Sequence, residues 1–214
     1  MSSHLATDGG RAATVFPTFV DELEARTRIQ DVLYRHSRGI DRNDQLGDRA
    51  AAYHPDAWVD SGAGRQPVAD LLTLRRREHD RTRHTMHSVT NVLIEFASPD
   101  VAAVESHVTA VEWEEAGYDF ASRGITDAGP CGARILSWCR YLDIFERRSG
   151  EWRILDRTVV FGDTTHEPLP VDPVLPQRFQ VQQHGAGDPV YVLAERARAL
   201  VEHRWTPADA HPAE

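Results

Sequence analysis

The order of the predicted elements indicates an α+β fold, with helices packed on one face of a mainly antiparallel sheet. Apolar residues recur at helical spacing in the first third of the chain. From residue 84 onward the pattern changes to long segments typical of strands, separated by turn signals such as Ser149-Gly150. Helices followed by a run of strands are the usual signature of this fold class.

The first helix is predicted over residues 22–41. Thr18 or Asp21 precedes it, and either side chain is suited to cap the first turn. One face of this helix is apolar apart from a histidine, and it consists of Ile29, Leu33, His36 and Ile40.

Two further helices are expected before the strands. A short one is predicted over 45–53 and is ended by Pro55, because a residue before proline avoids the helical conformation. A short strand is predicted over 57–61, and a third helix over 68–78.

Four strands are predicted at 84–96, 101–114, 135–146 and 152–161. The segment 115–133 between the second and third is rich in Gly, Asp and Ala and is too long for a hairpin turn. Loops of this length often cover a binding site, although a loosely ordered insertion has the same composition. Both interpretations stay open at this point.

The chain is divided into three parts on these grounds. Residues 1–17 are expected to form a disordered or loosely docked arm, and 18–163 to form the domain. Residues 164–214 are a C-terminal extension that is rich in proline at first and contains a predicted helix over 190–201. We expect this extension to dock on the domain or on a neighbouring subunit.

Composition excludes several classes of function. The formal net charge of −9 disfavours binding to nucleic acid or to an anionic membrane surface, since both need a basic face. The two cysteines are too few for a disulfide scaffold, and the eleven histidines show no metal-ligand spacing. The first residues resemble no signal peptide and no stretch is apolar enough to span a membrane, so a cytoplasmic location is expected.

Two residues stand out as candidates for chemistry. Asp41 ends the first predicted helix, and His87 lies near the start of the first long strand. A carboxylate beside a histidine orients the imidazole and fixes its tautomer, which makes a competent general base. Taken alone, each residue is also compatible with an ordinary structural role, and the spacing does not show that they meet.

Five sequence runs resemble one protein family in their order and spacing. They are IQDVLY at 29–34, GID at 39–41, YHPDA at 53–57, HSVTN at 87–91 and RYLDIFERRSGEWRI at 140–154. Together they resemble the SnoaL-like branch of the NTF2-like superfamily. The resemblance covers roughly residues 20–163 and implies a cone in which N-terminal helices pack on a curved, mainly antiparallel sheet.

The resemblance also gives the two candidate residues a role. Asp41 and His87 are similar in position to the catalytic pair of the group that contains scytalone dehydratase and lindane dehydrochlorinase. In that group the pair is the base for eliminations. Other members of the superfamily are isomerases, cyclases, hydrolases or non-catalytic binding proteins, so the fold alone implies no reaction. Four further residues are candidates for binding the substrate, namely Tyr34, His36, Asn91 and Tyr141.

The match to this group is partial. Ile40 stands where scytalone dehydratase has a tyrosine, and that enzyme's second catalytic histidine falls near Val111. Its polar residue of the third strand falls near Tyr141, and His36 stands where lindane dehydrochlorinase has a lysine. The base is therefore expected to be kept while the groups that hold the substrate differ.

The favoured hypothesis is a lyase of dehydratase type that acts on a small hydrophobic, polyketide-, steroid- or terpenoid-like substrate. Such acid–base chemistry needs no cofactor and no metal. Two alternatives remain open. The same base could drive an isomerisation or a polyketide cyclisation, or the domain could bind a ligand without catalysis. A homo-oligomer is also expected, and the resemblance favours a trimer over a dimer.

Overall fold

The computed structural model describes residues 15–44, 47–62, 64–78, 81–172 and 174–203. Six strands form one sheet in the order β2-β1-β6-β5-β4-β3. Neighbouring strands are antiparallel except β1 and β6, which run parallel. Helices precede the four long antiparallel strands β3, β4, β5 and β6 in the chain, so the α+β prediction is confirmed. The strand bounds are Tyr53–Asp60 (β1), Arg65–Pro67 (β2), Thr82–Ser98 (β3), Val101–Glu114 (β4), Ala133–Arg148 (β5) and Glu151–Pro168 (β6).

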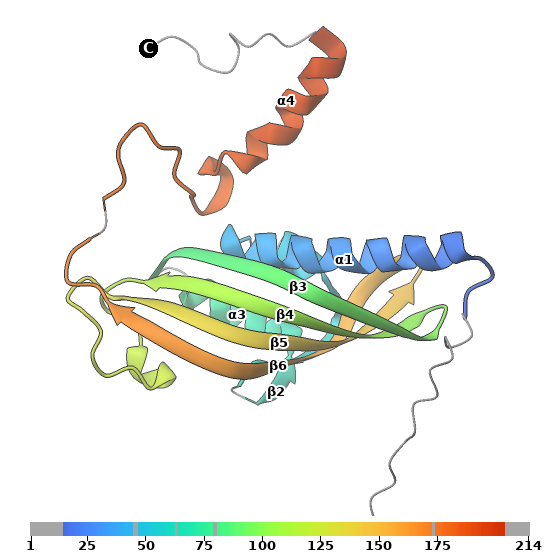
Figure 1. Ribbon diagram of the computed structural model, residues 1–214, viewed down its shortest axis with the longest axis horizontal. Coiled ribbons are helices and arrows are strands. Elements are labelled where there is room, and N and C mark those ends of the chain that lie inside the picture. Colours follow the sequence, from blue (N-terminus) through green and yellow to red (C-terminus); the bar gives the residue numbers. More distant parts are fainter. Residues whose placement is uncertain (1–14, 45–46, 63, 79–80, 173, 204–214) are drawn as a thin grey trace, which may run out of the picture.

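The long helix α1 spans Phe19–Asp41 and lies along the sheet (Figure 1). Thr18 caps it: the Thr18 hydroxyl oxygen accepts from the backbone N–H of Asp21 at 3.1 Å. The Asp21 carboxylate in turn accepts from the backbone N–H of Thr18 at 3.1 Å, which completes a capping box. The helix therefore begins three residues earlier than the apolar periodicity alone predicts.

The core lies between the helices and the inner face of the sheet. Ile29 and Leu33 of α1 are 0% and 1% exposed, and each contributes about 1.5–3 kcal/mol through the burial of its side chain. Helix α3, at Val68–Glu78 as predicted, adds Val68 and Leu71. From the sheet come Tyr53, Ala57, Val59, Ile94, Ala102, Val104, Phe145, Trp152 and Ile154.

The region between α1 and α3 corrects the prediction. Helix α2 is only Asp48–Ala51, and the strand β1 begins at Tyr53 instead of residue 57. Pro55 does not end a helix; it lies within β1, where the register against β6 shifts between Tyr53 and Trp58. Such an irregularity tolerates a residue without an N–H donor. The short strand β2, which pairs with β1, was not predicted.

The close approach of α2 to α1 depends on a glycine. A Cβ atom on Gly39 would lie 2.4 Å from the backbone nitrogen of Arg49. Because no side chain fits there, any larger residue would push α2 away from the end of α1. Arg49 lines the main cavity of the domain, so this contact helps to set the shape of that cavity.

The four long strands were predicted in the right order, but three of them are longer than predicted. β6 continues to Pro168 because it pairs along its whole length with β5, from Arg148 opposite Glu151 to Ala133 opposite Pro168. The segment between β4 and β5 contains the 3₁₀ helix η2 at Phe120–Arg123.

The C-terminal extension contacts the domain just beyond the end of α1. The backbone N–H of Gly185 donates to the carbonyl oxygen of Arg42 at 2.7 Å, and the Arg42 guanidinium pairs with the Asp188 carboxylate at 3.0 Å. After the 3₁₀ helix η3 (Gly185–Gly187), helix α4 (Val190–His203) stands apart from the sheet (Figure 1). Leu193 and Leu200 of α4 are 60% and 47% exposed. Docking of the extension on a neighbouring subunit remains a prediction.

Candidate active site

Asp41 is the last residue of α1, and the local sequence ends the helix there. The backbone N–H of Arg42 still donates to the carbonyl of Arg38 at 3.0 Å, but Asn43 takes a left-handed conformation with φ of 54°. Asparagine tolerates this conformation better than most residues, so it is a common helix terminator. The Asp41 side chain is thereby presented to strand β3, which packs against α1.

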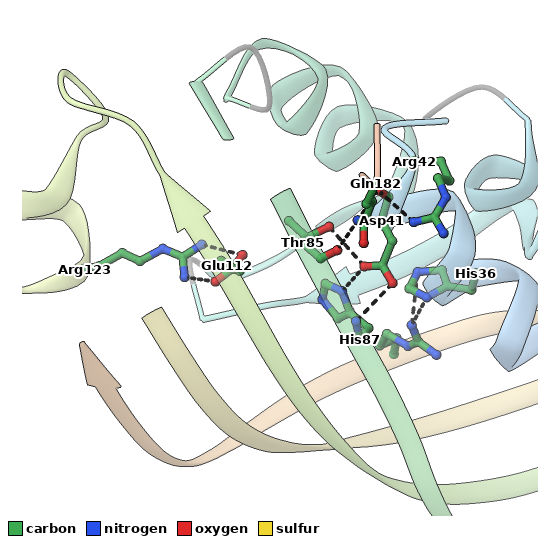
Figure 2. Close-up of polar contacts among 9 residues, drawn as sticks. His36, Asp41, Arg42, Thr85, His87, Glu112, Arg123 and Gln182 are labelled. Carbon is green, nitrogen blue, oxygen red and sulfur yellow. Dashed lines mark hydrogen bonds and ion pairs between the residues drawn. The ribbon is translucent and has the colours of Figure 1, made fainter. Parts of the chain in front are cut away.

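Strand β3 supplies three hydrogen bonds to the Asp41 carboxylate (Figure 2). Oδ1 of Asp41 lies 2.7 Å from Nδ1 of His87 and accepts from the Thr85 hydroxyl at 3.0 Å. Oδ2 accepts from the backbone N–H of His87 at 3.0 Å. Thr85 and His87 reach the same carboxylate because alternate residues of a strand share one face.

This geometry defines the tautomer of His87. An ionised carboxylate can only accept hydrogen bonds, so the hydrogen of the neutral imidazole lies on Nδ1. Nε2 then carries a lone pair and is directed away from Asp41, on a ring that lines the main cavity. The two side chains are 8% and 12% exposed, so little water competes for the contact.

Gln182 of the C-terminal extension contacts the backbone next to the Asp41–His87 pair. The side-chain amide of Gln182 donates to the carbonyl oxygen of Thr85 at 2.6 Å and to that of Asp41 at 3.2 Å (Figure 2). It therefore ties the end of α1 to the start of β3. The extension thus contributes to the geometry of the site, and sequence reasoning did not assign Gln182 a role.

The cavity beside His87 has a volume of about 600 Å³, enough for a molecule of one or two fused rings. Its walls combine apolar and polar side chains from all layers of the fold. The apolar part comprises Ile40, Val59, Leu71, Leu74, Ala110, Val159 and Phe161. The polar part includes Arg49, Tyr53, Glu112, Tyr118, Arg123, Cys139, Tyr141 and Arg157.

A buried polar network forms one wall. Arg157 makes a bidentate ion pair with Asp143, with both N–O distances at 2.7 Å and side-chain exposures of 2% and 0%. Burial alone would lower the pKa of Arg157, but the charge of Asp143 outweighs this and raises it, so the guanidinium stays charged. The same guanidinium lies 3.9 Å from the centroid of the Tyr141 ring.

His36 belongs to this network. Its Nε2 lies 2.9 Å from the hydroxyl of Tyr53, and the Nη1 atom of Arg157 lies 3.1 Å from its Nδ1. Burial, followed by the charges of Arg157 and Arg49, lowers the pKa of His36 well below its ordinary value. His36 is therefore a neutral structural group at neutral pH, and its contact with the hydroxyl helps to fix the position of Tyr53.

The predicted site residues divide into two sets. Asp41 and His87 are brought together, and Tyr141 lines the cavity. Of the other candidates, His36 is 2% exposed and is held by the network, and Tyr34 is 51% exposed on the outside of α1. Neither of these two is among the described residues that line the cavity.

Asn91 is also misplaced by the prediction. Strict alternation puts it on the same face as His87, but the register of β3 shifts between Thr90 and Leu93, and Asn91 has a φ of 48°. This bulge turns the strand and leaves Asn91 exposed, away from the cavity. Tyr34 lines a second cavity of about 220 Å³ together with Asp41 and His87, so its role in substrate binding stays a prediction, whereas His36 and Asn91 line neither of the two cavities.

The most informative of the missed residues is Glu112. It faces the cavity from β4, whereas Val111, next to it, points to the opposite face by alternation. The alternating pattern of β4 carried this signal, since Glu112 shares a face with Val108 and Ala110. Arg123, its partner, lies at the end of the short 3₁₀ helix η2, which no sequence pattern indicated.

The described residues contain neither a metal-ligand cluster nor a membrane-spanning helix. No group of three or more His, Cys, Asp or Glu side chains in that part of the chain could hold a metal ion. None of the helices described is long and apolar enough to cross a membrane. Both cysteines are free thiols, and Cys139 lines the cavity.

The fold and this site together define a class: an open-ended sheet whose inner face, covered by an N-terminal helix, encloses a cavity with an Asp–His pair. A family model, the SnoaL-like domain, matches residues 21–158. The chain therefore belongs to the SnoaL-like family of the NTF2-like superfamily. No curated protein sequence matches it.

Solved structures with the same fold include enzymes. A hexachlorocyclohexane dehydrochlorinase (LinA) type 2 is 23% identical over 76% of this chain and 100% of its own, with a TM-score of 0.59. A LinA-type3 dehydrochlorinase from Novosphingobium barchaimii is 23% identical over 74% and 99%, with a TM-score of 0.58. A candidate scytalone dehydratase from Novosphingobium aromaticivorans is 20% identical over 76% and 99%, with a TM-score of 0.57. At these identities the likeness establishes the fold alone.

Proposed function

We propose that this protein is a cofactor-independent lyase of dehydratase type. The observation that carries the proposal is the hydrogen-bonded Asp41–His87 pair, at 2.7 Å, on the wall of a cavity of about 600 Å³. Its structural neighbours include a dehydrochlorinase and a candidate dehydratase, which supports an elimination. The substrate would be a small, largely hydrophobic ring molecule of polyketide, steroid or terpenoid type.

In the proposed reaction Nε2 of His87 removes a proton from a carbon next to an activating group. The electron pair of the broken C–H bond forms the new double bond as the C–O bond of the leaving hydroxyl breaks. The proton on Nε2 passes to that hydroxyl, which departs as water, so the histidine returns to its neutral form. Asp41 acts as a positioning residue, because it fixes the tautomer and stabilises the imidazolium that forms.

Polar groups of the opposite wall would hold the activating carbonyl. Burial raises the pKa of Tyr141, so its hydroxyl remains protonated and can donate a hydrogen bond. Burial also raises the pKa of Tyr53, which lines the same cavity. Such fixed donors stabilise negative charge that develops on an oxygen.

The same proton abstraction would serve an isomerisation or a cyclisation, so the products decide between them. The purely ligand-binding alternative would be supported if Asp41 and His87 pointed apart or if side chains filled the cavity. Neither condition holds in the described structure, which favours an enzyme. We further propose a homo-oligomer, with a trimer favoured over a dimer.

The test measures proton abstraction separately from the loss of the leaving group. A panel of cyclic β-hydroxy ketones and their unsaturated isomers is incubated in D₂O, and NMR records deuterium uptake at the α-carbon together with the products. His87→Gln should abolish both exchange and turnover. His107→Gln is the matched control, because His107 is exposed on the outer face of β4, and it should leave both unchanged. Exchange that survives in His87→Gln refutes the base; exchange without elimination assigns the isomerase alternative.

A further inference from the structure

The segment 115–132 between β4 and β5 closes one side of the cavity. Three of its side chains line the cavity, namely Tyr118, Ser122 and Arg123. The segment is internally ordered: the Asp119 carboxylate caps η2 by accepting from the backbone N–H of Ser122 at 3.3 Å, and Ile125 is 5% exposed. The segment therefore presents a defined surface to whatever occupies the cavity.

Arg123 connects this segment to strand β4 of the sheet. Its two terminal nitrogens donate to the two carboxylate oxygens of Glu112, with Nη2 at 3.1 Å from Oε1 (Figure 2). Its Nε donates to the hydroxyl of Tyr118 at 2.9 Å. Among the residues described, these contacts use three of the five N–H groups of the guanidinium.

The pair is largely withdrawn from solvent, and its two charges cancel. Side-chain exposures are 22% for Arg123 and 17% for Glu112. Burial alone would lower the pKa of Arg123, but the charge and hydrogen bonds of Glu112, followed by the charges of Tyr118 and Glu114, raise it, so the guanidinium stays charged. An ion pair of this kind, once shut off from water, needs polar contacts from the ligand beside it.

Its distance from the base suits a small ring system. Ala110 lies opposite His87 in the sheet, and Glu112 lies opposite Thr85, two residues further along β4. Two residues of a strand span about 7 Å. A molecule that places its reacting carbon at His87 thus reaches Arg123 and Glu112 with its other end if it contains one or two rings.

We propose that Glu112 and Arg123 form a specificity site for a neutral, hydroxyl-bearing ring, and that this site selects the substrate of the base at His87. This inference rests on the proposed function, since it names the substrate class of the same cavity. A hydroxyl group both donates and accepts, so it can donate to the Glu112 carboxylate and accept from an Arg123 N–H.

Other ligand classes fit the pair less well. A carboxylate would meet the negative charge of Glu112, and an ammonium would meet the positive charge of Arg123. A hydrocarbon or halocarbon would bury the ion pair without any compensating hydrogen bond. Of the groups compared, only the neutral hydroxyl, with both donor and acceptor character, satisfies both partners at once.

The test is a binding experiment that needs no turnover. Calorimetry measures the affinity of the full chain for naphthalene, 2-naphthol and 2-naphthoate, and contacts from the ligand to the Ala110 methyl group in NMR locate each probe in the cavity. Wild type should bind 2-naphthol about tenfold more tightly than either of the others, the usual gain from hydrogen bonds to charged groups.

Variants of the two residues test which charge determines the preference among the three probes. Glu112→Gln removes the negative charge and leaves Arg123, so 2-naphthoate should become the preferred probe. Arg123→Met leaves the Glu112 carboxylate as an acceptor without its Arg123 partner, so 2-naphthol, which can donate to it, should stay ahead of naphthalene, and 2-naphthoate, which it repels, should bind most weakly. Arg134→Gln breaks the exposed Arg134–Glu167 pair and should change none of the three affinities.

Two results would overturn the inference. One is wild-type protein that binds 2-naphthoate or naphthalene as tightly as 2-naphthol. The other is an equal loss of affinity for all three probes in Glu112→Gln, which would show that the ion pair only fixes the 115–132 segment to the sheet. The three probes carry no leaving group, so their affinities test the specificity site alone, while deuterium exchange in His87→Gln tests the proposed function, and the two can fail separately.

Discussion

Replacing Asp41 by asparagine should reverse the tautomer of His87. In the wild type the carboxylate accepts three hydrogen bonds, from the Thr85 hydroxyl, from Nδ1 of His87 and from the backbone N–H of His87. Asparagine offers one oxygen and one NH₂ group in the same shape. Of the three partners, only the backbone N–H cannot change its role, so the amide oxygen is expected to take the Oδ2 position.

The NH₂ group then faces Thr85 and His87. The threonine hydroxyl can rotate to accept, and the imidazole can accept at Nδ1 if its hydrogen moves to Nε2. All partners are satisfied in this way, and no buried polar group is left without a bond. The consequence for function is large, because Nε2 would present a hydrogen to the cavity in place of a lone pair.

The size of the effect depends on the contribution of a positioned base. General-base catalysis is worth about 10²- to 10⁴-fold in rate, or about 3–5 kcal/mol of activation free energy. Asp41→Asn should lose most of that factor in α-proton exchange, while its thermal stability changes little. Thr85→Val is the matched control: it removes one of the three hydrogen bonds but keeps the carboxylate, so both tautomer and exchange should be retained.

The assay is long-range ¹H–¹⁵N correlation NMR, in which protonated and unprotonated ring nitrogens of His87 have well-separated shifts. Wild type should show hydrogen on Nδ1, and Asp41→Asn should show it on Nε2. An Asp41→Asn protein with the wild-type tautomer and a lost exchange activity would refute this reasoning. So would a reversed tautomer with the activity intact.

Three further predictions concern stability and assembly. Asp143→Asn should lower the free energy of unfolding by about 3–5 kcal/mol in urea titrations, since it leaves the buried Arg157 charge unpaired. The double variant Asp143→Leu with Arg157→Met should recover most of this loss. If it recovers none, the loss of stability does not come from the unpaired charge. Burial, with the nearby Arg157 charge, lowers the pKa of His36, so below about pH 6.5 the unfolded chain takes up a proton that the folded chain refuses. Stability should therefore fall as the pH drops below that value, by roughly 1 kcal/mol per pH unit, and less steeply in His36→Gln. On the outer face of β5, Leu142 and Ile144 are 38% and 40% exposed; if this face forms the proposed homo-oligomer, Leu142→Glu with Ile144→Glu should reduce the mass found by light scattering to that of a 24.0 kDa monomer.

The elements of this fold were predictable because their patterns are strong and local. The apolar face of α1, the bounds of α3 and the alternation of β4 each follow from residues within one element. The start of β1 was not predictable in this way, since Tyr53 joins the sheet through pairing with Ile154, about a hundred residues later. Long-range pairing also explains why β6 extends past Phe161.

The site was predictable only in part, for related reasons. Asp41 and His87 are 46 residues apart, and their meeting came from a family resemblance and not from spacing. Asn91 was misplaced because a bulge breaks the alternation on which its prediction depended. Gln182 comes from an irregular segment and Arg123 from the short 3₁₀ helix η2, and neither segment has a periodic pattern long enough to predict where a side chain points.

The charge balance of the cavity bears on which elimination this site performs. Chloride leaves as an anion and benefits from an uncompensated cation, whereas a hydroxyl leaves most readily as water once it has received a proton. Three guanidinium groups line the cavity, those of Arg49, Arg123 and Arg157, and two of them are paired with carboxylates, Arg157 with Asp143 and Arg123 with Glu112. The imidazolium formed at His87, in contrast, has a proton to give. We therefore expect a larger acceleration over the uncatalysed rate for a cyclic β-hydroxy ketone than for its β-chloro analogue. The ratio is measured with matched alcohol and chloride substrates, by monitoring product formation in wild type and in His87→Gln. A larger acceleration for the chloride would show that a cavity cation, and not the returned proton, stabilises the leaving group.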